Sequence, residues 1–384
     1  MEERRSDILG QPSWAFGNDQ VEIAVTVLGG HMAPVTFYRE TPAPVRPYYI
    51  SPWQGEGVKT GLPVLDVLRG DFLCMPFGAA NAYKGEDYPI HGESAGSAWS
   101  FEGLRKSGRI TELRLGLETR ARPGRITKRL QIADGQNVIY IRHDLAGYSG
   151  IMCLSHHAVI AVPEEPGSLR VSTAPTRKAT VVPRDARTNT GNEYYFLEPG
   201  AEFTNLARVP TIWKHAPFAD ISTHPLPYGF MDLVCVYPKI QRTPAWTAVT
   251  APKLGWLWFA LRDPEVLPQT TFWMSNGGRH AAPWSGRNRC LGVEDGCAYY
   301  GSGLTESARK NALNREGIPT TLSLSPARPT WIMHIQGAVK IPKGFDRVKT
   351  VQFHPGALTF SSASGKKAEA AVNWDFLQSG EIGG

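Results

Sequence analysis

The segment VEIAVTVL, residues 21–28, alternates between two kinds of side chain along its length. Every second residue from Val21 to Val27 is valine or isoleucine, and the residues between them are Glu22, Ala24 and Thr26. Successive side chains of a strand point to opposite sides of the sheet. The period of two therefore predicts a strand with one face on a core and the other on solvent or a second sheet.

The same alternation recurs through the chain. Leu113, Leu115 and Leu117 alternate with polar residues, and a second alternating run follows the turn at Pro123-Gly124. The 39 glycines and 30 prolines are spread along the sequence, which favours many short elements joined by turns. Further strands are predicted at Asn137 to His143, Met231 to Tyr237, Gly255 to Leu261, Thr271 to Met274, Thr330 to Gln336 and Val348 to Phe353.

One segment has the pattern of a helix, Thr305 to Glu316, with Thr305 as N-cap and Gly317 at the position that follows a helix. Many strands with so little helix predict an all-β protein, a large two-sheet antiparallel β-sandwich. The expected organisation is one domain over residues 1–384, with an N-terminal arm at 1–18 and a polar C-terminal tail at 361–384. The stretch Pro163 to Asn192, rich in proline, glycine and charge, is expected to be a surface excursion.

Composition narrows the range of partners. The net charge of +6 is modest for 384 residues, and no Lys/Arg stripe suited to a phosphate backbone is present, so no nucleic-acid partner is expected. No run of about 18 apolar residues occurs, and the opening MEERRSDILG lacks the apolar core of a signal peptide, so no membrane partner is expected. The five widely spaced cysteines form no disulfide framework or zinc motif. These features favour a cytoplasmic protein, either a monomer or a homodimer.

Four stretches carry residues suited to chemistry. They are DFLCMPFGAANAY with the following YPIHGESAGSAW, SHHAV at 155–159, YGFMDLVCVYP with Asp232, and RNRCLGVEDGCAY with Glu294. Each has a structural explanation: a His-Gly pair is usually a turn, and an Asp-Gly after a strand is first of all a hairpin turn. The adjacent His156 and His157 face opposite ways if they lie in a strand, so at most one enters a given site.

Taken in order, these stretches resemble the galactose mutarotase-like superfamily, which includes the aldose 1-epimerases. GGHMAPVTFYRE, PYYISPW, MPFGAAN, HGESAGSAW, SHHAV and CLGVEDG follow the order of that family's segments, from about Val21 to about Phe353. The resemblance implies a β-supersandwich with a sugar site on its concave face. It also implies interconversion of the α and β anomers of a sugar, with Glu294 as general base and His157 as general acid.

The resemblance assigns further residues to substrate binding. His91 and Asn81 would hydrogen-bond sugar hydroxyls, and Trp99 would supply an apolar wall. The other candidate substrate-binding residues are His156, Asp232 and Arg289. The choice between His156 and His157 as acid stays open, with His157 favoured because it directly precedes the small apolar run. The sequence departs from the family where Ala82 follows Asn81, Ala158-Val159 follows His157, and Asp295 follows Glu294.

Ring opening needs a base and an acid with pKa values near the working pH, expected on opposite sides of the substrate. Histidine meets that need, and partial burial would raise the pKa of Glu294 toward it. Neither a metal nor an organic cofactor is expected. The ligand is expected to be a small sugar, and Arg279, Arg287 and Arg289 could bind an anionic group on it or serve as loop charges.

Three functions compete on this scaffold. The first is an aldose 1-epimerase-like isomerase, and the second is a carbohydrate-binding protein without turnover. The third is a polysaccharide lyase or hydrolase, for which Tyr228, Tyr299 or Tyr300 would be the base, or Glu294 with Asp232 the paired carboxylates. No glycine-rich loop opens a helix after a strand, which argues against a nucleotide-binding protein.

Overall fold

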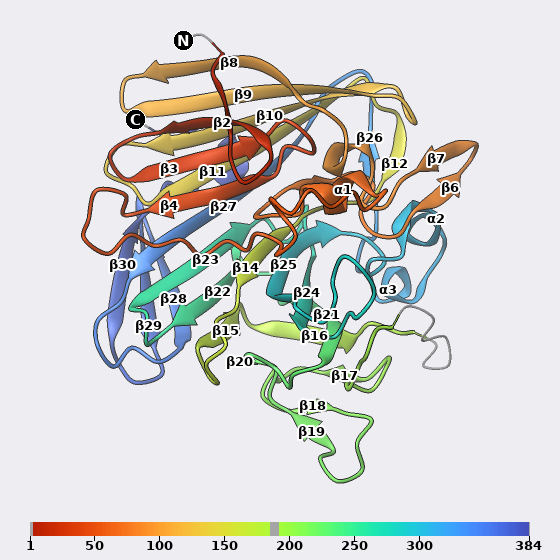
Figure 1. Ribbon diagram of the computed structural model, residues 1–384, viewed down its shortest axis with the longest axis vertical. Helices are drawn as coiled ribbons and strands as arrows, with labels where there is room; N and C mark the ends of the chain where they lie inside the picture. Colours follow the sequence, from red (N-terminus) through yellow and green to blue (C-terminus); the bar gives the residue numbers. More distant parts are fainter. Residues whose placement is uncertain (1–2, 185–191, 384) are drawn as a thin grey trace.

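The computed structural model describes residues 3–184 and 192–383. Its architecture is two large antiparallel sheets with smaller sheets packed around them, and the all-β prediction is confirmed (Figure 1). The nine-stranded sheet has the order β20 (Thr223–His224), β15 (Leu169–Thr173), β22 (Ala245–Ala251), β23 (Trp256–Arg262), β27 (Thr330–Lys340), β11 (Val138–Ala146), β10 (Gly124–Ala133), β9 (Ile110–Thr119) and β8 (Ser100–Ser107).

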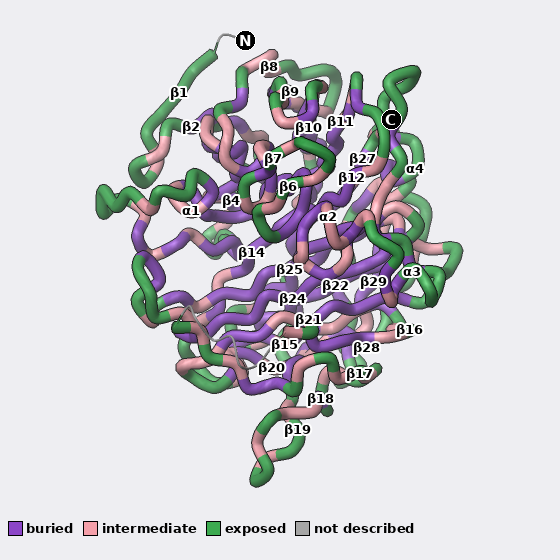
Figure 2. The backbone as a smooth tube through the Cα atoms, turned by 90° about the vertical axis from the view of Figure 1, so that its right-hand side faces the viewer, coloured by how far each residue is buried: buried purple, intermediate pink, exposed green. Residues whose placement is uncertain are grey.

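The second large sheet carries the candidate site. Its order is β17 (Glu202–Phe203), β16 (Thr176–Val181), β21 (Phe230–Pro238), β24 (Gln269–Asn276), β25 (Arg289–Cys297), β13 (Leu154–His156) and β5 (Leu73–Cys74), with β14 (Ala158–Ala161) also paired to β25. The strands that cross the middle of the molecule are buried along most of their length, whereas β1 is exposed and the β18–β19 hairpin is mostly exposed or intermediate (Figure 2).

Smaller sheets complete the fold. They are β1 (Arg5–Asp7), β2 (Pro12–Gly17), β3 (Val21–Thr26) and β4 (Met32–Phe37); β28 (Val348–His354), β29 (Ala357–Ser362) and β30 (Lys367–Ala371); and the pairs β6 (Asn81–Tyr83) with β7 (Glu86–Tyr88), β12 (Gly150–Met152) with β26 (Leu322–Leu324), and β18 (Val209–Pro210) with β19 (Phe218–Ala219). The short helices are α1 (Pro63–Asp66), α2 (Gly303–Ala308), α3 (Ala312–Arg315), α4 (Phe376–Ser379) and the 3₁₀ turn η1 (Glu93–Ala95). Within the described residues no helix is long and apolar enough to cross a membrane.

The two large sheets face each other across a core that contains paired charges. Asp295 on β25 accepts a hydrogen bond from His334 on β27 at 2.8 Å and contacts Arg262 on β23 at 2.8 Å. Burial of a carboxylate is tolerated here because cationic and hydrogen-bonding partners surround it. The contacts also establish direction: Asp295 points from the eight-stranded sheet toward the nine-stranded one.

Two sequence predictions about internal segments differ from the structure. The single helix predicted at 305–316 is two helices, because the buried Asn311 side chain caps α3 by accepting from the Asn314 amide and so ends the run. Gly317 follows with φ of 76°, as expected after a helix. The stretch 163–192 is not a simple excursion, since it holds β15 and β16 of the two large sheets, while its residues 185–191 lie outside the described part.

The chain ends also differ from the predicted arm and tail. Trp14 and Phe16 on β2 are buried in the main core, so this part of the first 18 residues is a strand paired with β3. At the other end Phe376 and Leu377 of α4 are buried against the nine-stranded sheet, beside β30. A few apolar side chains are enough to dock a short segment that has little periodicity of its own.

Candidate active site

A cavity of about 380 Å³ lies on the face of the eight-stranded sheet that is turned away from the nine-stranded one. Strands β21, β24 and β25 contribute its floor, and the segments around α1, Phe77 and Trp284 contribute its walls. The lining residues are Leu62, Val64, Leu65, Leu68, Phe72, Phe77, Gly78, Ala79, Ile90, His91, Val182, His157, Glu193, Leu233, Thr271, Trp273, Arg279, Trp284, Glu294 and Gly301.

Glu294 reaches this cavity because of the alternation of β25. Asp295 points toward the nine-stranded sheet, so its neighbour Glu294 points the other way. Gly292 shares the face with Glu294, and a Cβ atom at Gly292 would lie 2.7 Å from Glu294 Oε1. The absence of a side chain there leaves room for the carboxyl group. Burial raises the pKa of Glu294 to about 8, and the positive charge of Arg279 opposes the rise.

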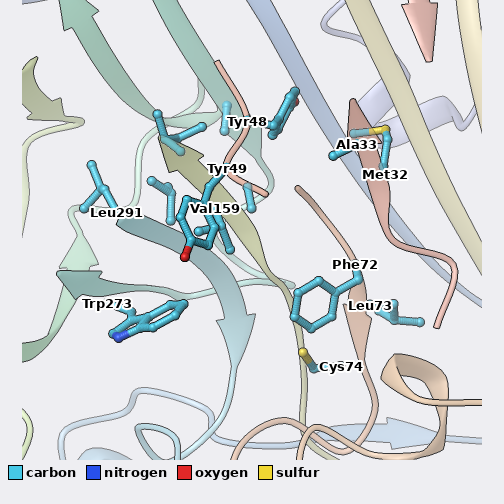
Figure 3. Close-up of a cluster of buried hydrophobic side chains, with 14 of the residues drawn as sticks. Met32, Ala33, Tyr48, Tyr49, Phe72, Leu73, Cys74, Val159, Trp273 and Leu291 are labelled. Carbon is cyan, nitrogen blue, oxygen red and sulfur yellow. The ribbon is translucent and has the colours of Figure 1, made fainter. Parts of the chain in front are cut away.

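His157 follows β13 and is held from both its backbone and its ring. Its amide donates to the Phe72 carbonyl at 2.9 Å, and its ring stacks on the Phe72 ring with centroids 4.4 Å apart. The other stacked neighbour of Phe72 is His31, with centroids 3.9 Å apart. Figure 3 shows Phe72 and Trp273 among the buried side chains of this region. Burial lowers the pKa of His157 well below its ordinary value, and His91 lowers it further.

His157 and Glu294 are in direct contact, with 3.3 Å between His157 Nε2 and Glu294 Oε1. Both side chains are almost entirely removed from solvent. The Nδ1 atom of His157 has no hydrogen-bond partner. The pair therefore lies side by side, which differs from the expectation of an acid and a base on opposite sides of a ligand.

His91 is the part of HGESAGSAW that enters the cavity. It adopts a left-handed backbone with φ of 59°, and Gly92 follows with φ of 75°. A Cβ at Gly92 would lie 2.0 Å from the Met75 carbonyl oxygen, so the turn requires glycine there. The His91 ring meets the His157 ring edge-on, with centroids 5.0 Å apart. Burial lowers the pKa of His91 to about 4.

A second polar group, an ion pair on aromatic rings, lines the cavity. Arg279 Nε lies 2.7 Å from Glu193 Oε1. The Arg279 guanidinium also lies over Trp284 at 4.8 Å and over Trp273 at 5.5 Å from the ring centroids. The positive charge of Arg279 is thus balanced by a carboxylate and attracted to the rings of two tryptophans. The sequence pointed to Arg279 as a loop charge or an anion-binding residue. It gave no sign that Glu193, 86 positions earlier, would be its partner.

The structure resolves which adjacent histidine enters the cavity. His156 is fully buried on the opposite side of the strand, where its Nδ1 lies 3.3 Å from Asp71 Oδ2 and its ring stacks on His334 at 4.3 Å. His157 alone of the two lines the cavity. Alternation along the strand gives this result, since neighbouring side chains take opposite faces.

Two residues assigned to sugar binding are engaged elsewhere. The Asn81 side-chain oxygen accepts from the Thr305 amide and hydroxyl, and its nitrogen donates to the Ala79 carbonyl. Trp99 donates its indole N–H to the Ser94 carbonyl at 3.0 Å and packs against Gly30 in the core. Neither lines the cavity. The polar groups of both side chains are already hydrogen-bonded to neighbouring segments. These bonds hold the loops in place and give Asn81 and Trp99 a structural role.

Asp232 and Arg289 also lie outside the lining of the cavity. Asp232 Oδ2 accepts from the amides of Phe196 and Leu197, and Oδ1 lies 3.2 Å from Arg184. Burial raises the pKa of Asp232 to about 7 although all these partners favour its charged form. Its neighbour Leu233 takes the cavity face of β21 instead. Arg289 forms an exposed ion pair with Glu164 at 2.6 Å.

Known structures share this architecture. No protein-family model and no curated protein sequence matches the chain. A galactose mutarotase-like protein from Clostridium acetobutylicum superposes with a TM-score of 0.56 over 87% of this chain and 97% of its own, at 11% identity. A galactose mutarotase related enzyme from Lactobacillus acidophilus gives 0.52 over 85% and 97%, at 11% identity. The chain has the galactose mutarotase-like fold.

A third neighbour with the mutarotase-like fold is a protein from Escherichia coli K12, provisionally described as an aldose 1-epimerase. Its TM-score is 0.55, with 86% of this chain and 99% of that chain covered at 12% identity. At these identities the similarity concerns the fold. The residues that could act within it are those placed by this chain's own geometry. Among the described residues, no three histidine, cysteine, aspartate or glutamate side chains are grouped to hold a metal ion.

Proposed function

We propose that this protein interconverts the anomers of a reducing sugar, with the His157–Glu294 pair moving the protons. The observation that carries the proposal is the 3.3 Å contact between an imidazole and a carboxyl group, both buried at the base of a cavity. The aldose 1-epimerase description of a structural neighbour adds support at the level of the fold. Five free, buried cysteines fit the reducing, cytoplasmic setting that belongs to the same proposal.

The electrostatics of the pair favour a single shared proton near neutral pH. Burial raises the pKa of Glu294 to about 8 and lowers that of His157, so losing the last proton and gaining a second one are both disfavoured. The two groups titrate as a unit, and the proton belongs to the pair. One partner is then a base and the other an acid in the same state, which is what ring opening requires.

The reaction leaves the proton count of the pair unchanged. The base takes the proton of the anomeric hydroxyl while the acid gives its proton to the ring oxygen. The bond between C1 and the ring oxygen breaks, its electron pair stays on that oxygen, and C1 becomes a carbonyl. After rotation about the C1–C2 bond, attack on the other carbonyl face reverses both transfers and yields the second anomer.

The side-by-side position of the pair suits this chemistry. The anomeric hydroxyl and the ring oxygen are bonded to the same carbon, so two adjacent proton-transfer groups can reach both from one direction. His91, whose ring lies against His157, is the group best placed to bind a neighbouring hydroxyl. The hydrolase alternative that pairs Glu294 with Asp232 is weakened, because Asp232 does not line the cavity.

The decisive experiment replaces the carboxyl group and keeps its shape. Exchange NMR and polarimetry on fresh anomers of several reducing sugars measure turnover, and calorimetry measures binding. Glu294→Gln should lower turnover about 10²–10⁴-fold and leave binding nearly unchanged. Glu164→Gln, at an exposed position, is the matched control. Wild-type turnover in Glu294→Gln would refute the proposed role, and sugar binding without any anomerisation by the wild type would favour a binding protein.

A further inference from the structure

Arg279 lines the cavity, and its guanidinium group has hydrogen-bonding capacity left over. Among the described residues of the lining it is the one lysine or arginine. Glu193 Oε1 lies 2.7 Å from Arg279 Nε, but this contact lacks the geometry of a hydrogen bond, and Nε is buried without a hydrogen-bond partner. Within the described part of the chain, Nη1 and Nη2 donate no hydrogen bond either. The guanidinium group therefore has N–H groups that a ligand oxygen can accept from.

The Arg279 side chain is held in place before any ligand binds. Its backbone pairs with that of Glu193 in an antiparallel bridge, and its carbonyl accepts from the Gly286 amide at 2.8 Å. Its guanidinium group lies over the rings of Trp284 and Trp273. A side chain that is already fixed loses less conformational entropy when it binds a ligand. Arg279 is thus suited to select one particular position of a ligand.

Trp273 connects Arg279 with the proton-transfer pair. Its ring centroid lies 5.5 Å from the Arg279 guanidinium carbon and 6.1 Å from the His157 ring centroid. The pKa of Glu294, which burial raises, is held down by the charge of Arg279, so the two groups are within electrostatic reach of each other. The cavity volume of about 380 Å³ is that of about a dozen water molecules at ~30 Å³ each, so a pyranose ring with its substituents fits inside. One sugar can therefore contact both groups.

The charge balance at Arg279 indicates which kind of oxygen it binds. The Glu193 carboxylate lies beside the guanidinium group, so the pair as a whole is neutral. A phosphate or carboxylate brought to Arg279 would be repelled by Glu193 as well as attracted by the guanidinium group. The oxygen of a hydroxyl accepts a charge-assisted hydrogen bond without that repulsion. The pair is therefore better matched to a neutral hydroxyl than to an anionic group.

We propose that Arg279 is a substrate-binding residue, which donates a hydrogen bond to one hydroxyl of a neutral sugar while the anomeric centre faces His157 and Glu294. The hydroxyl that it binds is one other than the anomeric hydroxyl. The inference rests on the proposed function for the orientation of the sugar. It adds the residue that distinguishes sugars by their hydroxyls, which the fold leaves open.

A series of deoxy sugars identifies the hydroxyl. D-glucose, D-galactose and D-mannose are compared by exchange NMR with their 2-, 3-, 4- and 6-deoxy derivatives. For the best parent sugar, we expect one derivative to lose about 10- to 100-fold in kcat/KM, which corresponds to a hydrogen bond with a charged group. Arg279→Met keeps an unbranched stem on the two tryptophan rings but has no donor. With this variant the parent sugar should lose the same factor, mainly through KM, and that derivative should lose no more.

The outcome depends on the coupling between the side chain and one hydroxyl. Wild-type kcat/KM in Arg279→Met would overturn the inference. Equal losses for the parent sugar and all its derivatives would overturn it as well, because a purely structural or electrostatic role treats every sugar alike. Each variant is measured at its own pH optimum, since removal of the Arg279 charge also lets the pKa of Glu294 rise.

Two further variants complete the comparison. Arg279→Gln is polar but shorter, so it should repeat the selective loss, and it keeps the test valid if Arg279→Met fails to fold. Arg287 lies in the same loop but forms an exposed ion pair with Glu56 outside the cavity lining. Arg287→Met should therefore leave every ratio unchanged. A selective loss as large as that of the Arg279 variants would contradict the assignment to Arg279.

Charged sugars test whether the bound group is neutral. D-galacturonate and D-glucose 6-phosphate should have kcat/KM values no higher than those of D-galactose and D-glucose, because Glu193 already balances the charge of Arg279. If the wild type prefers a charged sugar about 10-fold or more and Arg279→Met does not, the preference for a neutral hydroxyl is overturned.

The two proposals fail in different ways. Calorimetry in a Glu294→Gln background measures binding without turnover, so the effect of Arg279→Met on the Kd of each derivative can be followed even if no sugar is interconverted. A hydroxyl-specific effect on Kd without any anomerisation by the wild type would leave the binding role standing and remove the enzymatic function. Anomerisation in which no hydroxyl depends on Arg279 would leave the function standing and remove the binding role.

Discussion

At the scale of single residues, two adjacent histidines have separate tasks because a strand assigns them to opposite faces. His157 contacts Glu294 in the cavity, whereas His156 contacts Asp71 between the sheets. The Asp71 carboxylate is 2% exposed, and it keeps a lowered pKa in spite of burial mainly through His156. His156 is therefore a structural residue, and its neighbour is the proposed catalytic one.

Substitution separates these tasks. His156→Leu should destabilise the fold by about 3 kcal/mol, because it leaves the buried Asp71 carboxylate without its partner. His157→Gln should cost little stability and lower anomerisation about 10²–10⁴-fold. Urea unfolding and exchange NMR on both variants provide the comparison. If His156→Leu is as stable as the wild type, the structural assignment is wrong.

The shared proton predicts the shape of the pH profile. Activity requires one proton on the pair, so kcat/KM should follow a bell-shaped curve. The upper limb should fall near pH 8, where the raised pKa of Glu294 lies, and the lower limb well below pH 6.5, where His157 gains a second proton. This order is the reverse of the one expected from ordinary pKa values, in which the carboxylate would set the lower limb. A profile that is flat from pH 7 to 9 would contradict it.

At the scale of elements, β25 is organised so that its two faces carry different chemistry. Asp295 faces the charged core, Glu294 faces the cavity, and Gly292 leaves space beside Glu294. The neighbouring strand β24 contributes Trp273 directly opposite Gly292 in register. The strand thus places the buried Glu294 carboxyl group next to Gly292, whose missing side chain leaves the space that the carboxyl group occupies.

Filling that gap should disturb the site. A Cβ at Gly292 would lie 2.7 Å from Glu294 Oε1 and 2.9 Å from Trp273 Cβ, both too close. Gly292→Ala should therefore cost about 1–3 kcal/mol in stability and strongly reduce turnover. In a Glu294→Ala background the same substitution should cost less stability, because one of the two clashes is gone. Additive losses in this double-mutant cycle, measured by urea unfolding, would count against the steric explanation.

At the scale of the whole molecule, the core holds several histidines that are kept neutral. Burial lowers the pKa of His31 to about 3, of His224 to about 4, and of His143 well below its ordinary value. In the unfolded chain each would titrate near 6.5. Their contribution to the free energy of unfolding is fully present above pH 6.5 and is lost as the pH falls. Below pH 6.5 the unfolded chain binds protons on these histidines, whereas the folded protein does not.

The protein should therefore be sensitive to acid from about pH 6.5 downward. Each such histidine lowers the free energy of unfolding by up to ~1.4 kcal/mol per pH unit. Glu294 and Asp232 act in the opposite sense: their raised pKa values stabilise the fold at low pH, and that contribution is lost as the pH rises toward 8 for Glu294 and toward 7 for Asp232. The buried histidines outnumber these two carboxyl groups, so urea midpoints should fall from pH 7 to pH 5. His354→Gln, at an exposed position, should leave the slope unchanged, and a midpoint independent of pH would refute the prediction.

The sequence by itself determined many of the strands, because their period of two is local: the predicted segments at 231–237 and 271–274 lie within observed strands, and the one at 255–261 overlaps β23 from residue 256 onward. It also singled out His91, His157 and Glu294, which line the cavity. The sequence did not show that Asn311 interrupts a helical pattern, since that depends on the cap and the burial of one amide.

Only the tertiary structure decided the composition of the cavity. Glu193 and Arg279 meet across 86 positions, and Leu65, Val182 and Leu233 line the cavity from three distant segments. Asn81 and Trp99 were plausible binding residues until their hydrogen bonds to Thr305 and Ser94 were known. A side chain's partners depend on which strands are paired and which faces are buried. Those long-range contacts leave no periodic trace in the local sequence.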